Sequence, residues 1–138
     1  MKIILRNALA VIAGLLLGSI ANMALVIAAP HVIPLPAGID VNDPKSLAAG
    51  MPLLAPKHFL FPFLAHAVGT FVGALTAHLI AATRRNTLAT VIGVLFLAGG
   101  IAACFMIPAP VWFVGLDLLV AYLPMAWLGA RAGRGLRV

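Results

Sequence analysis

The sequence predicts one all-α domain over residues 1–138, an integral membrane four-helix bundle. First, 64% of the 138 residues are hydrophobic and only 9% are charged, whereas a soluble domain has roughly 25% charged residues. Second, four uninterrupted apolar stretches each reach about 20 residues, the length that crosses a hydrocarbon core as a helix. Third, the stretches lack the alternation of a β-barrel, and only helices and closed barrels satisfy the backbone in lipid.

The first predicted span covers residues 8–29 and follows two basic residues, Lys2 and Arg6. Small residues at its end resemble a signal-peptide cleavage site. However, the apolar run exceeds the roughly 7–15 residues of a signal-peptide core, and Pro30 would follow any cut after Ala29. We therefore expect a retained signal-anchor helix.

Residues 30–57 form the long connection and contain six of the ten prolines. Within it, Asp43 fits the N-cap of a short helix, Pro44 its first position and Gly50 its end. We expect an ordered, Pro-rich loop that lies as a cap on the extracytoplasmic face, with a flexible connector as the alternative.

The remaining spans are predicted at residues 59–83, 88–107 and 111–130, and short connections make them antiparallel neighbours. Two basic residues, Lys45 and Lys57, then lie at one end of the bundle. Seven lie at the other end: Lys2, Arg6, Arg84, Arg85, Arg131, Arg134 and Arg137. Because cytoplasmic segments carry the excess of Lys and Arg, both termini are predicted to be cytoplasmic. The expected location is the bacterial inner (cytoplasmic) membrane, crossed several times.

Small residues recur every four positions in the first two spans and include GxxxG motifs, formed by Gly14 and Gly18 and by Gly69 and Gly73. Residues four apart share a helix face, and small side chains let two helices approach closely in lipid. The spacing favours packing of span one on span two, and a homodimer seam is the alternative.

Polar residues from three spans are predicted to lie at one depth. At 1.5 Å per residue, Asp117, His66 and Asn22 each lie about 10 Å from the outer ends of their spans. Thr70 is one turn from His66. An intramembrane Asp and His can clamp helices together or relay protons, and both interpretations stay open.

Pro124 interrupts the fourth span and is predicted to kink it, since proline removes a backbone hydrogen bond. Tyr122 and Asp117 lie on the same span, so the kink is expected to shape a polar pocket. His78 is placed near the inner end, where it would reach the headgroups, and Trp112 and Trp127 fit the interfacial aromatic belt.

The sequence gives little support for a metal site, a catalytic site or nucleic-acid binding. The single cysteine, Cys104, excludes cysteine-pair sites, and His31, Asp40, Asp43 and His58 lack a metal-ligand spacing. No phosphate loop, nucleophile elbow or zinc-protease motif is present, so we expect no enzyme, metal or cofactor. Despite a net charge of +6, the basic residues lie only at the ends of apolar runs, which argues against nucleic-acid binding.

Two segments carry a resemblance, Pro34–Asp40 and Ala65–Ala74. Their pattern resembles that of short, uncharacterised four-span bacterial inner-membrane proteins. The resemblance covers most of the chain and implies a topology but no activity.

Together these observations predict an accessory or interaction subunit with a structural polar clamp in the outer half of the bilayer. Its expected partners are membrane lipids and either a second copy of the chain or another membrane protein. The alternative is a small oligomeric proton-coupled transporter or channel centred on Asp117 and His66.

Overall fold

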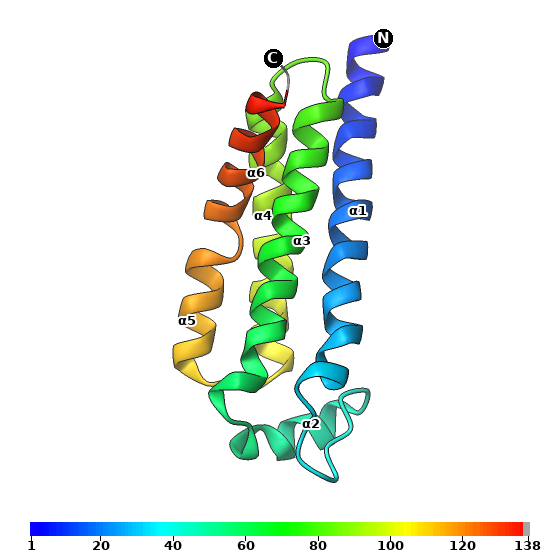
Figure 1. Cartoon of the computed structure of the whole chain (residues 1–138). Coiled ribbons are helices and arrows are strands. Elements are labelled where there is room, and N and C mark those ends of the chain that lie inside the picture. Colours follow the sequence, from blue (N-terminus) through cyan, green and yellow to red (C-terminus); the bar gives the residue numbers. More distant parts are fainter. Residues whose placement is uncertain (137–138) are drawn as a thin grey trace.

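The computed structural model describes residues 1–136, and its regular structure across them is entirely helical. Four segments are long and apolar enough to cross a membrane: Lys2–Val32, Pro56–Ile80, Arg85–Met106 and Val111–Gly135. They run side by side as an elongated bundle (Figure 1). The predicted all-α architecture, with four long apolar helical segments packed together, is confirmed.

The helices are α1 (Lys2–Val32), α2 (Pro44–Gly50), α3 (Leu60–Ile80), α4 (Arg85–Met106), α5 (Val111–Val120) and α6 (Leu123–Gly135). Short 3-10 turns, Met51–Leu53 and Pro56–Phe59, link α2 to α3. Helix α3 lies at the centre and packs against α1, α4 and α6. It therefore positions side chains that neighbouring helices can reach.

The α1–α3 contact is close enough to exclude side chains at its glycines. A Cβ added to Gly14 would lie 2.7 Å from the Gly73 carbonyl oxygen, and one on Gly18 would lie 2.6 Å from the Gly69 oxygen. Backbone therefore meets backbone along this seam, as small-residue stripes permit in lipid. The structure brings both glycine pairs together within one chain.

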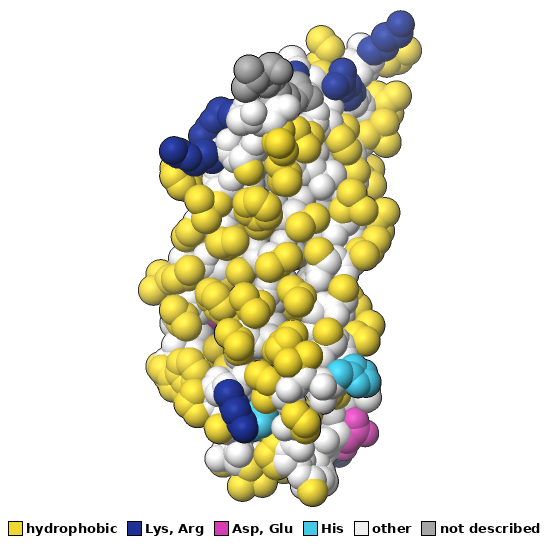
Figure 2. Space-filling model, viewed as in Figure 1, with side chains coloured by type: hydrophobic (Ala, Val, Ile, Leu, Met, Phe, Trp, Pro, Cys, Tyr) yellow, Lys and Arg dark blue, Asp and Glu magenta, His cyan; other side chains and the backbone are white. Residues whose placement is uncertain are grey.

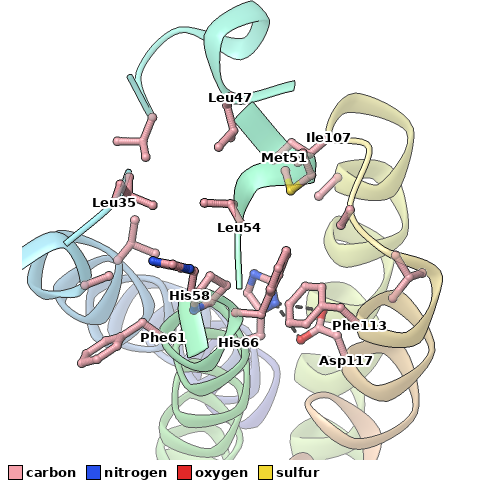
Figure 3. Close-up of a pocket in the computed structure, with 18 of the residues that line it drawn as sticks. Leu35, Leu47, Met51, Leu54, His58, Phe61, His66, Ile107, Phe113 and Asp117 are labelled. Carbon is pink, nitrogen blue, oxygen red and sulfur yellow. Dashed lines mark hydrogen bonds and ion pairs between the residues drawn. The ribbon is translucent and has the colours of Figure 1, made fainter. Parts of the chain in front are cut away.

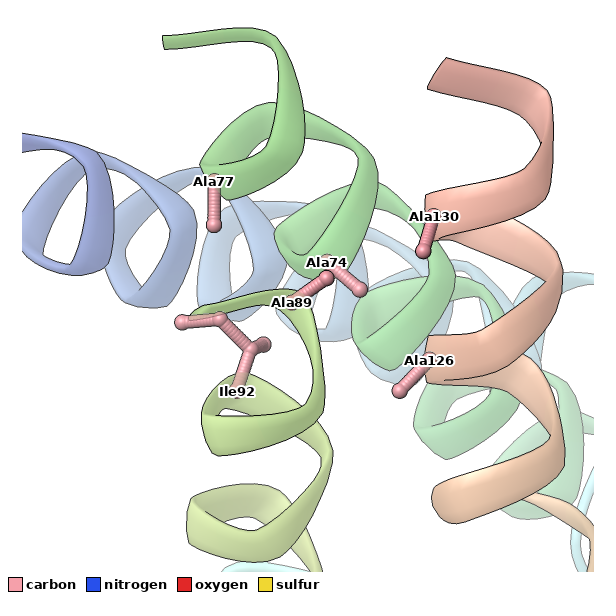
Figure 4. Packing of buried hydrophobic residues seen from close by; sticks show 6 residues of the cluster. All are labelled: Ala74, Ala77, Ala89, Ile92, Ala126 and Ala130. Atoms are coloured by element: carbon pink, nitrogen blue, oxygen red, sulfur yellow. The ribbon is translucent and has the colours of Figure 1, made fainter. Parts of the chain in front are cut away.

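Small residues also fill the core where α3, α4 and α6 meet (Figure 4). The buried cluster consists of Ala74, Ala77, Ala89, Ile92, Ala126 and Ala130. Because alanine adds little bulk, the three helices approach closely where this cluster lies.

Helix ends differ from the sequence-based boundaries. Helix α1 continues through Pro30 to Val32, and α3 stops at Ile80 rather than at residue 83. Asn7 of α1 accepts hydrogen bonds from the backbone N–H groups of Ala82 and Thr83, at 2.9 and 3.2 Å. These bonds satisfy backbone N–H groups of the turn that follows α3, so the helix ends earlier than predicted.

The fourth span is broken rather than kinked. Helix α5 ends at Val120 and α6 begins at Leu123, with Pro124 in the first turn of α6. Tyr122 has φ −113° and ψ −83°, outside the helical region. Ala121 and Tyr122 are 0% and 1% exposed, so the irregular backbone at the break is buried within the protein, where it is tolerated.

The basic side chains gather at one end of the bundle. The amino end of α1, the α3–α4 connection and the end of α6 lie together there, and Figure 2 shows Lys and Arg at that end. Lys45 and Lys57 lie at the opposite end, on the segment that contains α2. Arg137, counted with the first group from the sequence, lies outside the described residues.

Residues 33–59 cover the end of the bundle opposite the basic residues, and we call this segment the cap. Asp43 accepts hydrogen bonds from the backbone N–H groups of Lys45 and Ser46, and Pro44 begins α2, as the sequence indicated. Helix α2 ends at Gly50, as predicted, and the chain continues as the 3-10 turn Met51–Leu53. The lack of a side chain at Gly50 also makes room for Ile39, whose Cδ1 would lie 2.5 Å from an added Cβ.

Candidate functional site

A polar network joins α3 to the broken fourth span. The Nδ1 atom of His66 lies 2.9 Å from each carboxylate oxygen of Asp117. The Tyr122 hydroxyl donates a hydrogen bond of 3.0 Å to Oδ2 of the same carboxylate. Asp117 is only 4% exposed, so the interactions form in a setting where an unpaired charge would be costly.

The break in the fourth span brings Tyr122 to this site. In an uninterrupted helix, residues five apart point in directions that differ by on the order of 140°. Residues 117 and 122 would then face different neighbours. The turn at Ala121 and Tyr122 redirects the tyrosine, whose ring stacks on His66 with centroids 5.7 Å apart and planes at 27°.

Gly100 of α4 makes room for the tyrosine. A Cβ at this position would collide with the Tyr122 hydroxyl. The small-residue stripes that the sequence predicts lie on the first two spans, so this role of Gly100 was not predicted. Only the break that redirects the tyrosine reveals the glycine's partner.

Thr70 bonds to the backbone of α3 rather than to the His66–Asp117 pair. Its hydroxyl donates a hydrogen bond of 2.8 Å to the His66 backbone carbonyl, one turn earlier on α3. It is fully buried. Thr70 therefore lies next to the network but does not contact the His66 ring or Asp117 by a hydrogen bond within residues 1–136.

Asn22 is at the expected depth but is not part of the network. Its Cβ packs against Gly69, and across the described chain it forms no hydrogen bond with His66 or Asp117. It lines a cavity of about 430 Å³ together with Ser19, His66 and Tyr122. The prediction for Asn22 rested on its depth in its span, which matches that of the site. Depth does not determine whether the side chain points toward the Asp117 carboxylate.

A second cavity, of about 350 Å³, lies beneath the cap and is lined by parts of α1, α3, α4 and α5 (Figure 3). We call it the outer cavity. His66 and Asp117 lie on its wall, and most other lining residues are apolar. Both cavities share His66, Gly100 and Ala103, so the histidine stands between them.

The chemistry of the network follows from which His66 nitrogen is engaged. Nδ1 faces the carboxylate, so a neutral imidazole in this orientation donates from Nδ1 and carries its lone pair on Nε2. Within the described part of the chain, Nε2 has no hydrogen-bond partner. The arrangement can hold helices together and can also present one hydrogen-bonding atom to a cavity.

Two titratable residues of the cap form hydrogen bonds within the cap. In the cap, Asp40 accepts from the Asn42 backbone N–H, and His58 bonds to Ala55 and to the Pro34 carbonyl. Across residues 1–136, no group of three His, Cys, Asp or Glu side chains lies close enough to hold a metal ion.

His78 departs from its expected place at the headgroups. It is only 3% exposed, and its ring lies against Gly133 of α6. A glycine facing the histidine opens this space, and sequence position alone could not show that pairing. The expectation that His78 reaches the lipid headgroups is wrong.

Comparisons with protein-family models, with curated proteins and with solved structures yielded no match. The resemblance to short four-span bacterial proteins stays a prediction.

Proposed function

We propose that this integral membrane protein is an accessory or interaction subunit of the bacterial inner membrane, with both termini in the cytoplasm. The closed polar network carries the proposal, because both Asp117 oxygens are bound by His66 and Tyr122. A carboxylate engaged in this way acts as a clamp between α3 and the fourth span. The proposed orientation rests on the basic residues at one end of the bundle.

The cap supports an interaction role because it exposes apolar side chains at an end of the molecule that also carries charges. Leu53 is 67% exposed and Val41 is 48% exposed, and Lys45 and Lys57 are exposed on the same segment. Apolar side chains rimmed by polar ones are typical of protein contact surfaces. The proposed partner is another membrane protein that meets the extracytoplasmic face.

A photo-crosslinking residue at position 53 tests this role in intact cells. We expect one discrete adduct with a membrane protein, and a crosslinker at exposed position 87, in the first turn of α4 at the opposite end of the bundle, should give much less of it. Equal labelling from both positions, or self-adducts alone, would contradict contact with a different protein through Leu53.

A second candidate, a small proton-coupled transporter, is favoured by one observation: His66 lines both cavities beside a broken helix. Broken helices near the bilayer midplane often form ion and substrate sites. The protein in liposomes with an internal pH dye distinguishes the two functions. The clamp predicts no proton flux in the wild type, whereas transport predicts flux that Asp117→Asn removes without unfolding the protein.

A further inference from the structure

The outer cavity has the size and lining of a small-molecule site. Its volume of about 350 Å³ falls in the range of roughly 300–1,000 Å³ typical of ligand pockets. Leu47, Met51 and Leu54 of the cap line it from one side, and Phe61 and Phe113 line it from the helices (Figure 3). An occupant would therefore place an apolar body under the cap.

Few polar atoms of the wall remain for an occupant. The ring nitrogens of His58 bond to Ala55 and to the Pro34 carbonyl. Both oxygens of Asp117 are engaged by His66 and Tyr122. Among the imidazole nitrogens on the described wall of this cavity, Nε2 of His66 is the one without a hydrogen-bond partner.

The His66 ring is held in place before any ligand arrives. Its Nδ1 bonds to Asp117, and its face stacks on Tyr122. With the proton of the neutral ring on Nδ1, Nε2 accepts a hydrogen bond. A fixed acceptor at the edge of an apolar cavity selects a ligand that donates one hydrogen bond.

Charge narrows the ligand class further. Among the described residues, no Lys or Arg lines the outer cavity, and Asp117 is on its wall. A phosphate headgroup or a fatty-acid carboxylate would therefore be desolvated beside a negative charge without a cationic partner. A neutral hydroxyl avoids this penalty.

We propose that the outer cavity binds a neutral lipophilic hydroxy compound, a phenol or alcohol, whose hydroxyl donates to Nε2 of His66. The apolar body of the ligand lies under the cap among Leu54, Phe61 and Phe113. The ligand reaches the cavity from the membrane, where such molecules dissolve.

Cys104, the single cysteine, lines the cavity and serves as a built-in reporter. The experiment measures its alkylation by N-ethylmaleimide in the purified full-length protein, with 1-naphthol as the probe. We expect saturating 1-naphthol to slow alkylation about tenfold, the effect of roughly 1.4 kcal/mol of occupancy advantage. The ether 1-methoxynaphthalene, which has the same rings but no donor, should give little protection. Equal protection by both compounds, or none by either, would overturn the proposal.

Two variants locate the site without touching the polar network. Val114→Trp adds bulk to the cavity wall from α5, whereas Leu116→Trp places the same side chain at an exposed position on α5 outside the lining. For each variant, protection is the alkylation rate without 1-naphthol divided by the rate with it. Protection should disappear in Val114→Trp and persist in Leu116→Trp. Protection that survives in Val114→Trp would place the binding elsewhere and contradict the proposal.

Discussion

Asp117 and His66 show what depth along a helix can and cannot predict. Counting residues from the ends of the apolar runs placed both at one level, and the structure puts the His66 nitrogen 2.9 Å from the carboxylate. The same count placed Asn22 there, yet Asn22 faces a different cavity. Depth is one coordinate, whereas contact also needs the rotation of each helix about its axis, which only packing fixes.

The clamp makes a prediction about stability at the level of these residues. Asp117→Leu leaves the His66 N–H and the Tyr122 hydroxyl without their acceptor, so we expect a loss of about 1–3 kcal/mol in unfolding free energy. The double variant Asp117→Leu/His66→Leu should lose less stability than the two single variants lose in sum. Replacing His66 removes one of the groups that Asp117→Leu leaves unsatisfied. Reversible unfolding in detergent measures this coupling. Strict additivity would show that the pair is not a clamp.

Tyr122→Phe tests the remaining bond of the same carboxylate. The variant keeps the ring that stacks on His66 and removes only the hydroxyl that donates to Asp117. Hydrogen bonds between membrane helices average about 0.6 kcal/mol, so we expect a small loss of stability in the same unfolding assay. A loss as large as that of Asp117→Leu would mean that the tyrosine, not the histidine, dominates the network.

At the level of elements, the apolar runs predicted the four spans well, but their ends and interruptions were less predictable. Pro124 indicated a disturbance, yet proline chemistry alone does not say whether a helix bends or stops. The early end of α3 depends on Asn7, a residue 75 positions from Ala82 in sequence. Such a capping interaction is invisible until the two helices are paired.

The α1–α3 seam predicts a sharp difference between two glycines. Gly14→Leu forces a side chain against the Gly73 carbonyl, so we expect a destabilisation of about 1–3 kcal/mol or separation of α1 from α3. Gly99→Leu is the matched control, since no atom lies within 4 Å of its added Cβ. Thermal unfolding in detergent compares them. Equal losses would argue against close packing of α1 on α3 at this seam.

For the whole molecule, the separation of charge between the two ends predicts its orientation in the membrane. In a Cys104→Ala background, Lys45→Cys should react with an impermeant maleimide added outside intact cells, and Thr87→Cys should react only after the membrane is opened. Both native residues are exposed, and the elements that hold them, α2 and the first turn of α4, lie at opposite ends of the bundle (Figure 1). The reverse pattern would invert the proposed topology.

Helix α1 is longer than its apolar run. Its 31 residues extend about 46 Å at 1.5 Å per residue, whereas the apolar residues 8–29 cover about 33 Å, close to a hydrocarbon core of about 30 Å. The turns beyond the apolar run bring polar groups of α1 to the end of α3, where Arg6 donates to the Ile80 carbonyl at 2.7 Å and Asn7 accepts from the Ala82 backbone N–H. Together with the glycine seam, these bonds hold α1 and α3 along much of their length. The two helices therefore form one paired unit on which the rest of the bundle packs.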